Sequence, residues 1–268
     1  ELKKFKNYVQ SDFMTKFISD MSIDYNNYIK HDTAYGNYFG MHFYPFWHNP
    51  NQEDFTGIID SYFLEHMVCT MYVHDPDKKY LYTYAGSSSL FLAILIFGRE
   101  RGGDIMFHSM LALIESNIAK SYSIDYQSTT LQEAFLLYDI YTDGKNHDLW
   151  MPYVTKPLTP LYQECLDNIL SNDEGQVKSL LSDMLDYHVK QSNNDNFVRS
   201  EFTYPSQRVF PTEILALIHY RHTQGKSIDF IDDEVLSVFV PYIKAGNFRP
   251  SPAVEKARND MYGLLGIR

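Results

Sequence analysis

The chain has 268 residues, 44% of them hydrophobic, which suits one large domain or two closely packed helical halves. A formal net charge of -11 disfavours direct binding to DNA, RNA or anionic lipid and favours a basic partner. The 22 tyrosines and 18 phenylalanines are many for a globular protein, so some should lie at an interface. We therefore expect a protein partner, and neither nucleic acid nor membrane.

The chain contains two cysteines, Cys69 and Cys165, which indicate buried thiols in a reducing compartment rather than a disulfide framework. The longest apolar run, 90–97, is far shorter than the roughly 20 residues needed to span a bilayer. These features predict a cytoplasmic protein. Because the chain begins at Glu1, a removed signal peptide stays open.

The first part of the chain predicts helices that flank an aromatic segment. Apolar side chains at helical spacing predict one or two helices in residues 1–34. Residues 35–56 mix glycines and prolines with aromatic side chains, which predicts an ordered loop or a pair of short helices. A helix is expected over 54–71, before a turn at 75–77. The alternating tyrosines of 80–84 indicate a short extended segment.

The middle of the chain predicts a central helix and its neighbours. The apolar run should form a helix ending at Gly102-Gly103, with a position in the centre of the fold. Asp104 can cap the next helix. Thr130 and Glu133 have the spacing of a capping box, in which the carboxylate accepts the N–H of the capping residue. Residues 145–157 show no periodicity and predict a connection between the halves.

The last part of the chain predicts four further helices. Thr159-Pro160 starts the first of them, 173–191 forms the second, and Ser251-Pro252 opens the last. Between them, 210–225 predicts a helix with Pro211 at its start, Glu213 in its first turn and a left-handed Gly225 at its end. Its last turn should expose His219, Arg221 and His222 for contact.

Together these elements predict an all-α multi-helix bundle of about 10 to 12 helices in two intimately packed halves, 1–150 and 151–268. The first half has 11 Lys and Arg against 19 Asp and Glu, and the second has 12 against 15. The first half is thus the more acidic one, and the two are expected to form one continuous globular unit.

Histidines raise the alternative of a metal-dependent HD-type hydrolase. The only suitable set is His48 or His66 with His74-Asp75, and Pro76 places that pair in a turn. Glu65, His66 and Cys69 do not share one helical face either. We therefore expect no enzyme, no cofactor and no metal site.

Carboxylates interleaved with Tyr and Trp suit a protein that occupies a basic cleft of another protein, because charge steers the encounter and rings anchor it. The alternative for each acidic cluster is a solvated turn or a helix cap. The candidate partner-binding residues are Tyr44, Trp47, Glu53, Asp54, Asp75, Asp77, Asp229, Asp232, Asp233 and Glu234.

The run Phe210-Pro211-x-Glu213-Ile214-Leu215-Ala216-Leu217, followed by Arg221-His222, Gly225, an acidic-apolar segment and Pro241, resembles a known family. It is similar to the C-terminal part of all-α immunity proteins of bacterial polymorphic toxin systems, nearest to immunity family 49, with the PoNe-immunity type second. The resemblance implies a cytoplasmic inhibitor that binds a cognate toxin used in interbacterial competition. A basic nuclease-type toxin would fit the charge. A helical scaffold or adaptor with another partner is the alternative.

Overall fold

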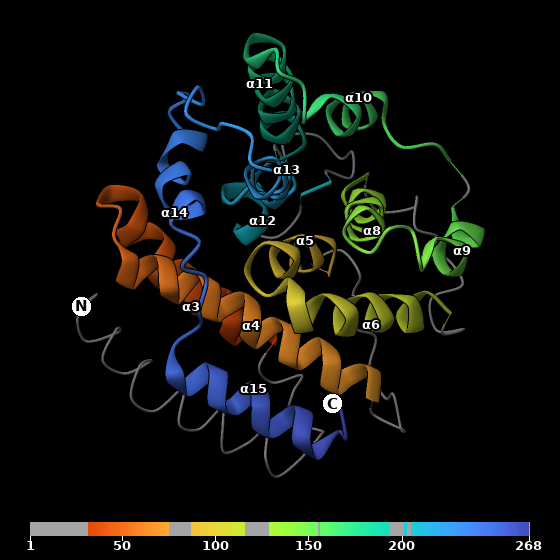
Figure 1. The fold of residues 1–268 in the computed structure, drawn as a ribbon. Helices are drawn as coiled ribbons and strands as arrows, with labels where there is room; N and C mark the ends of the chain where they lie inside the picture. Colours follow the sequence, from red (N-terminus) through yellow and green to blue (C-terminus); the bar gives the residue numbers. More distant parts are fainter. Residues whose placement is uncertain are drawn as a thin grey trace. The chain divides into compact units, whose positions relative to one another are not determined.

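The computed structural model describes residues 32–74, 87–115, 129–154, 156–192, 201–202 and 205–267. These residues form twelve α-helices joined by short 3-10 and π turns, and no strand occurs among them. This confirms the predicted all-α fold (Figure 1). The helices expected before residue 32 and the extended segment at 80–84 lie outside the described residues. None of the helices described is both long and apolar enough to cross a membrane.

The chain forms two compact units whose boundaries differ from the expected halves. One unit consists of Glu1–Tyr82 and Phe248–Arg268, and the other of Thr83–Asn247. The C-terminal segment belongs to the first unit because its helix packs on a helix formed by residues 52–74. A contact between such distant segments leaves no trace in local composition, so the division at residue 150 does not follow the units.

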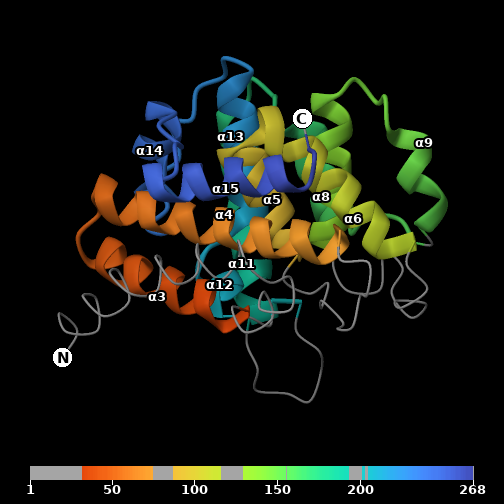
Figure 2. The same cartoon turned by 90° about the horizontal axis from the view of Figure 1, so that it is seen from below.

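The first unit is built on α4 (Gln52–His74), which lies between α3 (Asp32–His48) and α15 (Pro252–Leu264) (Figure 2). Residues 57–71 of α4 are all buried. A Cβ atom on Gly57 would lie 2.1 Å from the ring of His42, so glycine is required there for the histidine of α3 to pack on α4.

Residues 35–56, predicted as an ordered loop or a pair of short helices, instead form most of the 17-residue α3, which continues through Pro45, and the first turn of α4. Two glycines in a helix cost about 2 kcal/mol and an interior proline about 3 kcal/mol. Burying a phenylalanine side chain contributes about 1.5 to 3 kcal/mol, and α3 buries three. Tertiary burial therefore offsets the unfavourable propensities. The buried rings are those of Phe39, Phe43 and Phe46.

The second unit surrounds α5 (Ser87–Phe97), which packs against α8 (Thr129–Tyr141) and α13 (Thr212–Thr223) (Figure 1). Residues 88–97 are buried throughout, which confirms the predicted central position. The predicted end at Gly102-Gly103 is wrong, because α5 ends at Phe97 and residues 99–103 form a separate π-helix. The remaining elements of the second unit are η4 (Arg99–Gly103), α6 (Asp104–Glu115), α9 (His147–Trp150), η6 (Met151–Tyr153), α10 (Pro160–Asn168), α11 (Glu174–Ser192), α12 (Pro205–Val209), η7 (Leu236–Val238) and α14 (Val240–Ala245).

The segment 145–157, predicted as a connection between halves, contains α9 and η6 and contributes to the core of the second unit. Trp150 is fully buried and stacks on Phe135, with ring centroids 5.2 Å apart. Its indole N–H donates to Oδ2 of Asp139 over 2.9 Å. One aromatic anchor thus fixes a segment that has no helical periodicity.

The helix expected over 210–225 is present as α13, and Gly225 has the predicted left-handed conformation, with φ of 72°. The exposed end predicted for it is wrong at two positions, because His219 and Arg221 are 9% and 1% exposed. Of the three predicted contact residues only His222 is half-buried.

Arg221 has a structural role. Its Nε donates to the carbonyl of Ser227 over 2.7 Å, and its Nη1 donates to the carbonyls of Ile169 and Ser171 over 2.6 and 2.8 Å. Its guanidinium also lies 5.1 Å from the ring centroid of Phe230. One side chain therefore joins the end of α13 to the segment after α10.

Replacing Arg221 should destabilise the protein strongly. Arg221→Ala leaves three carbonyls without their donor and should lower the free energy of unfolding by about 3 kcal/mol. Arg221→Lys keeps the charge but cannot reach all three acceptors, so a loss of about 2 kcal/mol is expected. Urea unfolding measures both. The half-buried neighbour is the control: His222→Ala should stay within about 0.5 kcal/mol of the parent.

Candidate functional site

Tyr44 and Trp47, both predicted to contact a partner, lie near the end of α3 with 67% and 38% of their surface exposed. Side chains three residues apart on a helix are neighbours. The buried ring of Phe43 stacks on Trp47 at a centroid distance of 6.1 Å and meets Tyr44 edge-on at 6.3 Å. The pair, which we call the aromatic edge, is thus supported from beneath by a packed ring.

Glu53 and Asp54, predicted as one acidic pair, have different surroundings at the start of α4. Glu53 is exposed. Asp54 is 7% exposed; its Oδ1 lies 3.1 Å from Nδ1 of His42, and its Oδ2 accepts a 2.9 Å hydrogen bond from Asn51. This corrects the prediction for Asp54, whose carboxylate joins α3 to α4 instead of facing a partner. Asp75 and Asp77 lie outside the described residues.

The predicted acidic turn of residues 229–234 lies in the second unit, and lysines neutralise two of its carboxylates. Asp229 forms an ion pair with Lys244. Asp232 forms one with Lys178 at 2.6 Å, and the hydrogen bond and charge of that lysine lower the pKa of Asp232. The turn therefore carries less free negative charge than its sequence indicates.

The other two carboxylates of the turn differ from each other. Asp233 accepts the backbone N–H of Val235 over 2.8 Å and that of Leu236 over 3.2 Å, so it caps the turn before η7. Glu234 is exposed. As a capping group, Asp233 is a poor choice for testing partner binding, because its replacement alters the local structure.

A cavity of about 120 Å³ lies beside the acidic turn. Its lining includes Leu181, Ile231 and Leu236, with Lys178, Asp232 and Asp233. Small-molecule sites usually have about 300 to 1,000 Å³, whereas this volume corresponds to about four water molecules. The cavity is therefore too small for a metabolite-sized ligand.

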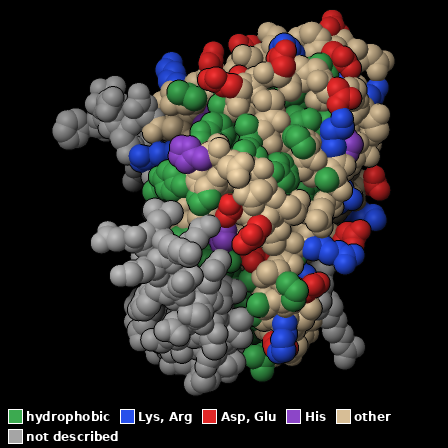
Figure 3. Space-filling view, turned by 90° about the vertical axis from the view of Figure 1, so that its left-hand side faces the viewer, with side chains coloured by type: hydrophobic (Ala, Val, Ile, Leu, Met, Phe, Trp, Pro, Cys, Tyr) green, Lys and Arg blue, Asp and Glu red, His purple; other side chains and the backbone are tan. Residues whose placement is uncertain are grey.

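Charged side chains of both signs are interspersed on the face shown in Figure 3, and exposed hydrophobic side chains lie among them. The net charge of -11 is thus not gathered into one acidic area on the part of that face that the structure describes. Binding through this face would depend on individual side chains as much as on long-range attraction.

The histidine and cysteine candidates for a metal site are engaged within the first unit. Nε2 of His66 lies 2.6 Å from the hydroxyl of Tyr262, and burial with the charge of Arg258 lowers the pKa of His66 to about 3. Nδ1 of His74 lies 2.8 Å from the carbonyl of Thr70, and Cys69 is a buried free thiol. Within the described ranges, no three His, Cys, Asp or Glu side chains are arranged to hold a metal ion.

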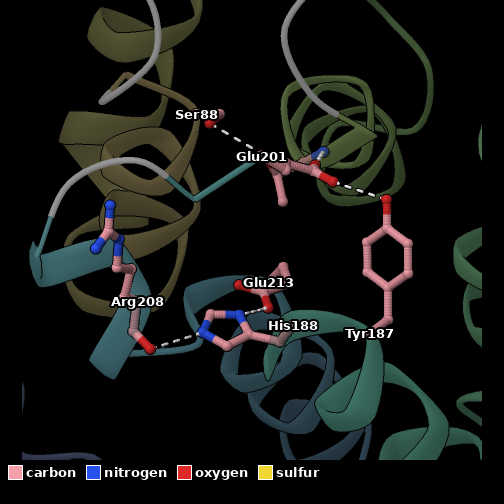
Figure 4. A network of polar contacts seen from close by, with 7 residues as sticks. Ser88, Tyr187, His188, Glu201, Arg208 and Glu213 are labelled. Atoms are coloured by element: carbon pink, nitrogen blue, oxygen red, sulfur yellow. Dashed lines mark hydrogen bonds and ion pairs between the residues drawn. The ribbon is translucent and has the colours of Figure 1, made fainter. Parts of the chain in front are cut away.

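A group of polar side chains that the sequence did not indicate is buried in the second unit, where α8, α10, α11 and α13 pack together. We call it the buried glutamate cluster. It consists of Glu133, Glu213, Tyr162 and His188, which are buried, and of Glu201 and Tyr187, which are half-buried. Figure 4 shows His188 between Glu213 and the backbone of Arg208, and Glu201 beside Tyr187.

Glu213 and His188 form a buried ion pair. Oε1 of Glu213 lies 2.5 Å from Nδ1 of His188, and Nε2 of the same ring lies 3.1 Å from the carbonyl oxygen of Arg208 (Figure 4). Both ring nitrogens thus face oxygen atoms, and a doubly protonated imidazolium donates to both. Burial acts to lower the pKa of His188, but Glu213 outweighs it and the pKa is raised.

Glu201 links two helices through its carboxylate. Its Oε1 accepts the backbone N–H of Thr130 over 3.2 Å, and its Oε2 accepts the hydroxyl of Tyr187 over 2.9 Å. Thr130 in turn donates its hydroxyl to Oγ of Ser88 over 3.1 Å. Burial raises the pKa of Glu201 to about 7 although these hydrogen bonds act in the opposite direction.

Glu133 is fully buried, and among the described residues neither of its carboxyl oxygens has a hydrogen-bond partner. The hydroxyl of Tyr162 and Oε2 of Glu213 are also buried without a hydrogen-bond partner among the described residues. Burial raises the pKa of Glu133 well above its ordinary value, and the nearby charges of Glu213 and Glu201 raise it further. The cluster can therefore hold one ion pair and a neutral carboxylic acid.

From the sequence, Glu133 was predicted to cap the start of one helix and Glu213 to lie in the first turn of another. In the structure the N–H of Thr130, expected to bond Glu133, donates to Glu201 instead. Glu213 pairs with His188 rather than only complementing the helix dipole. A signal was available, since each glutamate precedes a buried leucine, Leu137 or Leu217, by four residues and so shares its helical face.

The class of protein defined by this geometry is an all-α protein of two compact helical units, with a supported aromatic edge in the first and a buried glutamate cluster in the second. Comparisons of the chain with family models, curated proteins and solved structures gave no match. The resemblance to immunity proteins therefore stays a prediction.

Asp54 and Glu53 make a matched pair for a stability test. Asp54→Ala removes the buried contacts to His42 and Asn51, and should lower the free energy of unfolding by about 2 kcal/mol. Glu53→Ala removes an exposed carboxylate and should change it by less than about 0.5 kcal/mol. Urea unfolding of both variants gives the answer. Equal stabilities would contradict the structural role of Asp54.

Proposed function

We propose that this protein is a non-enzymatic inhibitor that binds a protein toxin, and that the aromatic edge of α3 is part of the binding surface. The observation that carries the proposal is the exposure of Tyr44 and Trp47, at 67% and 38%, on a helix that buries Tyr38 and three phenylalanines. Exposed tyrosine and tryptophan are typical anchors of protein interfaces.

The support beneath the aromatic edge favours a binding role. Phe43 packs against both rings, and Phe39 stacks on Phe43 at a centroid distance of 5.2 Å. Rings held in this way lose little conformational freedom on binding, so more of their contact energy contributes to affinity. The sequence places these aromatic side chains close together, which is consistent with selection for a rigid surface.

Charge supports a basic partner. Glu53 is exposed at the start of α4, only six residues after Trp47, so it adds a carboxylate close along the chain to the aromatic edge. In the second unit Glu234 is exposed, whereas Asp229 and Asp232 have lysine partners. With a net charge of -11, such a surface steers toward a basic cleft, as a nuclease-type toxin would offer.

A scaffold or adaptor would use the same aromatic edge for a different partner. The two functions differ in the partner's properties, not in the surface of this chain. A partner that is toxic when produced alone and harmless when produced together with this chain identifies an inhibitor. A partner without toxicity identifies an adaptor.

Removal of the aromatic edge should weaken partner binding without loss of stability. The partner is captured from the source cell with tagged protein, identified and purified, and its toxicity is tested with and without this chain. Tyr44→Ala/Trp47→Ala should weaken its binding by at least about 2 kcal/mol, or about 30-fold, because two interface anchors are lost. Titration calorimetry measures the affinity, and growth with the co-produced variant measures protection.

Leu264→Ala is the matched control, since Leu264 is 68% exposed on α15 of the same unit. It should bind and protect like the parent. If the partner is toxic and binds the double variant as tightly as the parent, the inhibitor function stands. The aromatic edge is then not part of the binding surface.

A further inference from the structure

The buried glutamate cluster contains more acidic groups than cationic ones. Three carboxyl groups lie near the imidazole of His188 in the second unit: Glu133 and Glu213 are buried, and Glu201 is half-buried. Ionised carboxylates without a partner are strongly disfavoured in an apolar interior, so the excess must be neutralised. A bound proton neutralises a carboxylate without any further group.

The hydrogen bonds indicate which glutamate keeps a proton. Glu213 has the imidazolium of His188 as its donor, and Glu201 has the N–H of Thr130 and the hydroxyl of Tyr187. Each of these donors stabilises an ionised carboxylate. Glu133 has no donor among the described residues, although it is fully buried. Its ionised form is therefore the least stabilised of the three.

Among the described residues, the charges that act on Glu133 are the carboxylates of Glu213 and Glu201, which both disfavour its ionisation. Arg208, whose carbonyl oxygen lies 3.1 Å from Nε2 of His188, donates its Nε to the carbonyl of Phe202 over 3.2 Å. The thiol of Cys165 on α10 is also close enough to feel the charge of Glu133, and the exposed carboxylates of Glu164 and Asp183 act on that thiol as well.

We propose that Glu133 is a buried proton-binding site: it is a neutral carboxylic acid in the folded chain, and loss of its proton places a third negative charge beside Glu201 and Glu213, which opposes the packing of α8 in the second unit. The site makes the stability of this unit depend on pH. Nothing in the proposed inhibitor function requires it.

The direction of the effect follows from the pKa shifts. Burial raises the pKa of Glu201 from 4.5 to about 7, and that of Glu133 lies well above 4.5. Above pH 4.5 the unfolded chain loses these protons while the folded chain still holds them. Their contribution to the free energy of unfolding is therefore complete below pH 4.5 and decreases as pH rises. The raised pKa of His188 acts in the same direction at higher pH. Each extra proton changes the unfolding constant about tenfold per pH unit.

The test compares Glu133→Gln with the parent by urea unfolding at several pH values between 4.5 and about 7, the ordinary and shifted values of Glu201. Glutamine matches the shape of the neutral acid and cannot ionise. With each unit of rising pH, the unfolding constant of the parent should increase about tenfold relative to that of Glu133→Gln. The variant therefore gains stability relative to the parent as pH rises. A difference that is constant with pH, or that favours the parent at higher pH, overturns the proposal.

Other buried groups titrate as well, and the comparison cancels them. Burial lowers the pKa of His66 to about 3 and that of His219 to about 4, and raises that of Asp60 to about 6, in both proteins. The control variant Glu164→Gln removes an exposed carboxylate from α10 and shows the effect of charge loss alone. If Glu164→Gln gains as much stability relative to the parent with rising pH as Glu133→Gln does, the proposal is also overturned.

An infrared measurement tests the protonation of Glu133 independently of stability. A neutral Glu133 gives the carbonyl band of a buried carboxylic acid, which is separated from the carboxylate bands. Because Glu201, with a pKa of about 7, absorbs in the same region at neutral pH, the spectrum of Glu133→Gln is subtracted from that of the parent, or that of Glu133→Met if glutamine does not fold. The difference should contain the carbonyl band of a carboxylic acid. A parent spectrum that equals the variant spectrum in this region overturns the proposal.

Discussion

The second unit depends on how buried charge is balanced between Glu213 and His188. The 2.5 Å contact holds α11 to α13, while the other ring nitrogen reaches the carbonyl of Arg208 at 3.1 Å. Breaking one partner of such a pair typically costs about 3 to 5 kcal/mol, because the other charge stays buried. α13 also packs against α5 and α8, so the ion pair is made by a helix that contacts several others of this unit. The charge of Glu213 in turn raises the pKa of the buried Glu133, because a buried region can accept only a limited net charge.

Features fixed by neighbouring residues could be predicted from the sequence. Thr159-Pro160 and Ser251-Pro252 begin helices as expected, since proline at a first helical position loses no hydrogen bond. Gly225 ends α13 in a left-handed conformation. The apolar run 90–97 is central because a helix without a polar face has no stable place at the surface. In each case the cause lies within a few residues of its effect.

Features decided by distant residues could not be predicted in this way. A glutamate in the first turn of a helix suits the helix dipole wherever it faces, so Glu133 and Glu213 were assigned to helix ends. In the structure, Glu213 pairs with His188, which is 25 residues away, and the N–H of Thr130 that was assigned to Glu133 donates to Glu201, which is 71 residues away. The continuation of α3 through Pro45 has a similar origin, because it depends on the packing of three phenylalanines. Local propensity was outweighed by tertiary burial in both units.

The adjacent carboxylates Glu53 and Asp54 show why an acidic cluster cannot be interpreted from composition alone. Successive helical residues point about 100° apart, so one of them faces solvent while the other reaches His42. His42 packs where only Gly57 leaves room, and α3 carries the aromatic edge on the turns that follow it. Asp54 therefore holds α3 on α4 and helps to fix the position of Tyr44 and Trp47. In the proposed binding surface its effect on a partner would be indirect. Long-range attraction would come from the exposed Glu53, and affinity would come from the two rings.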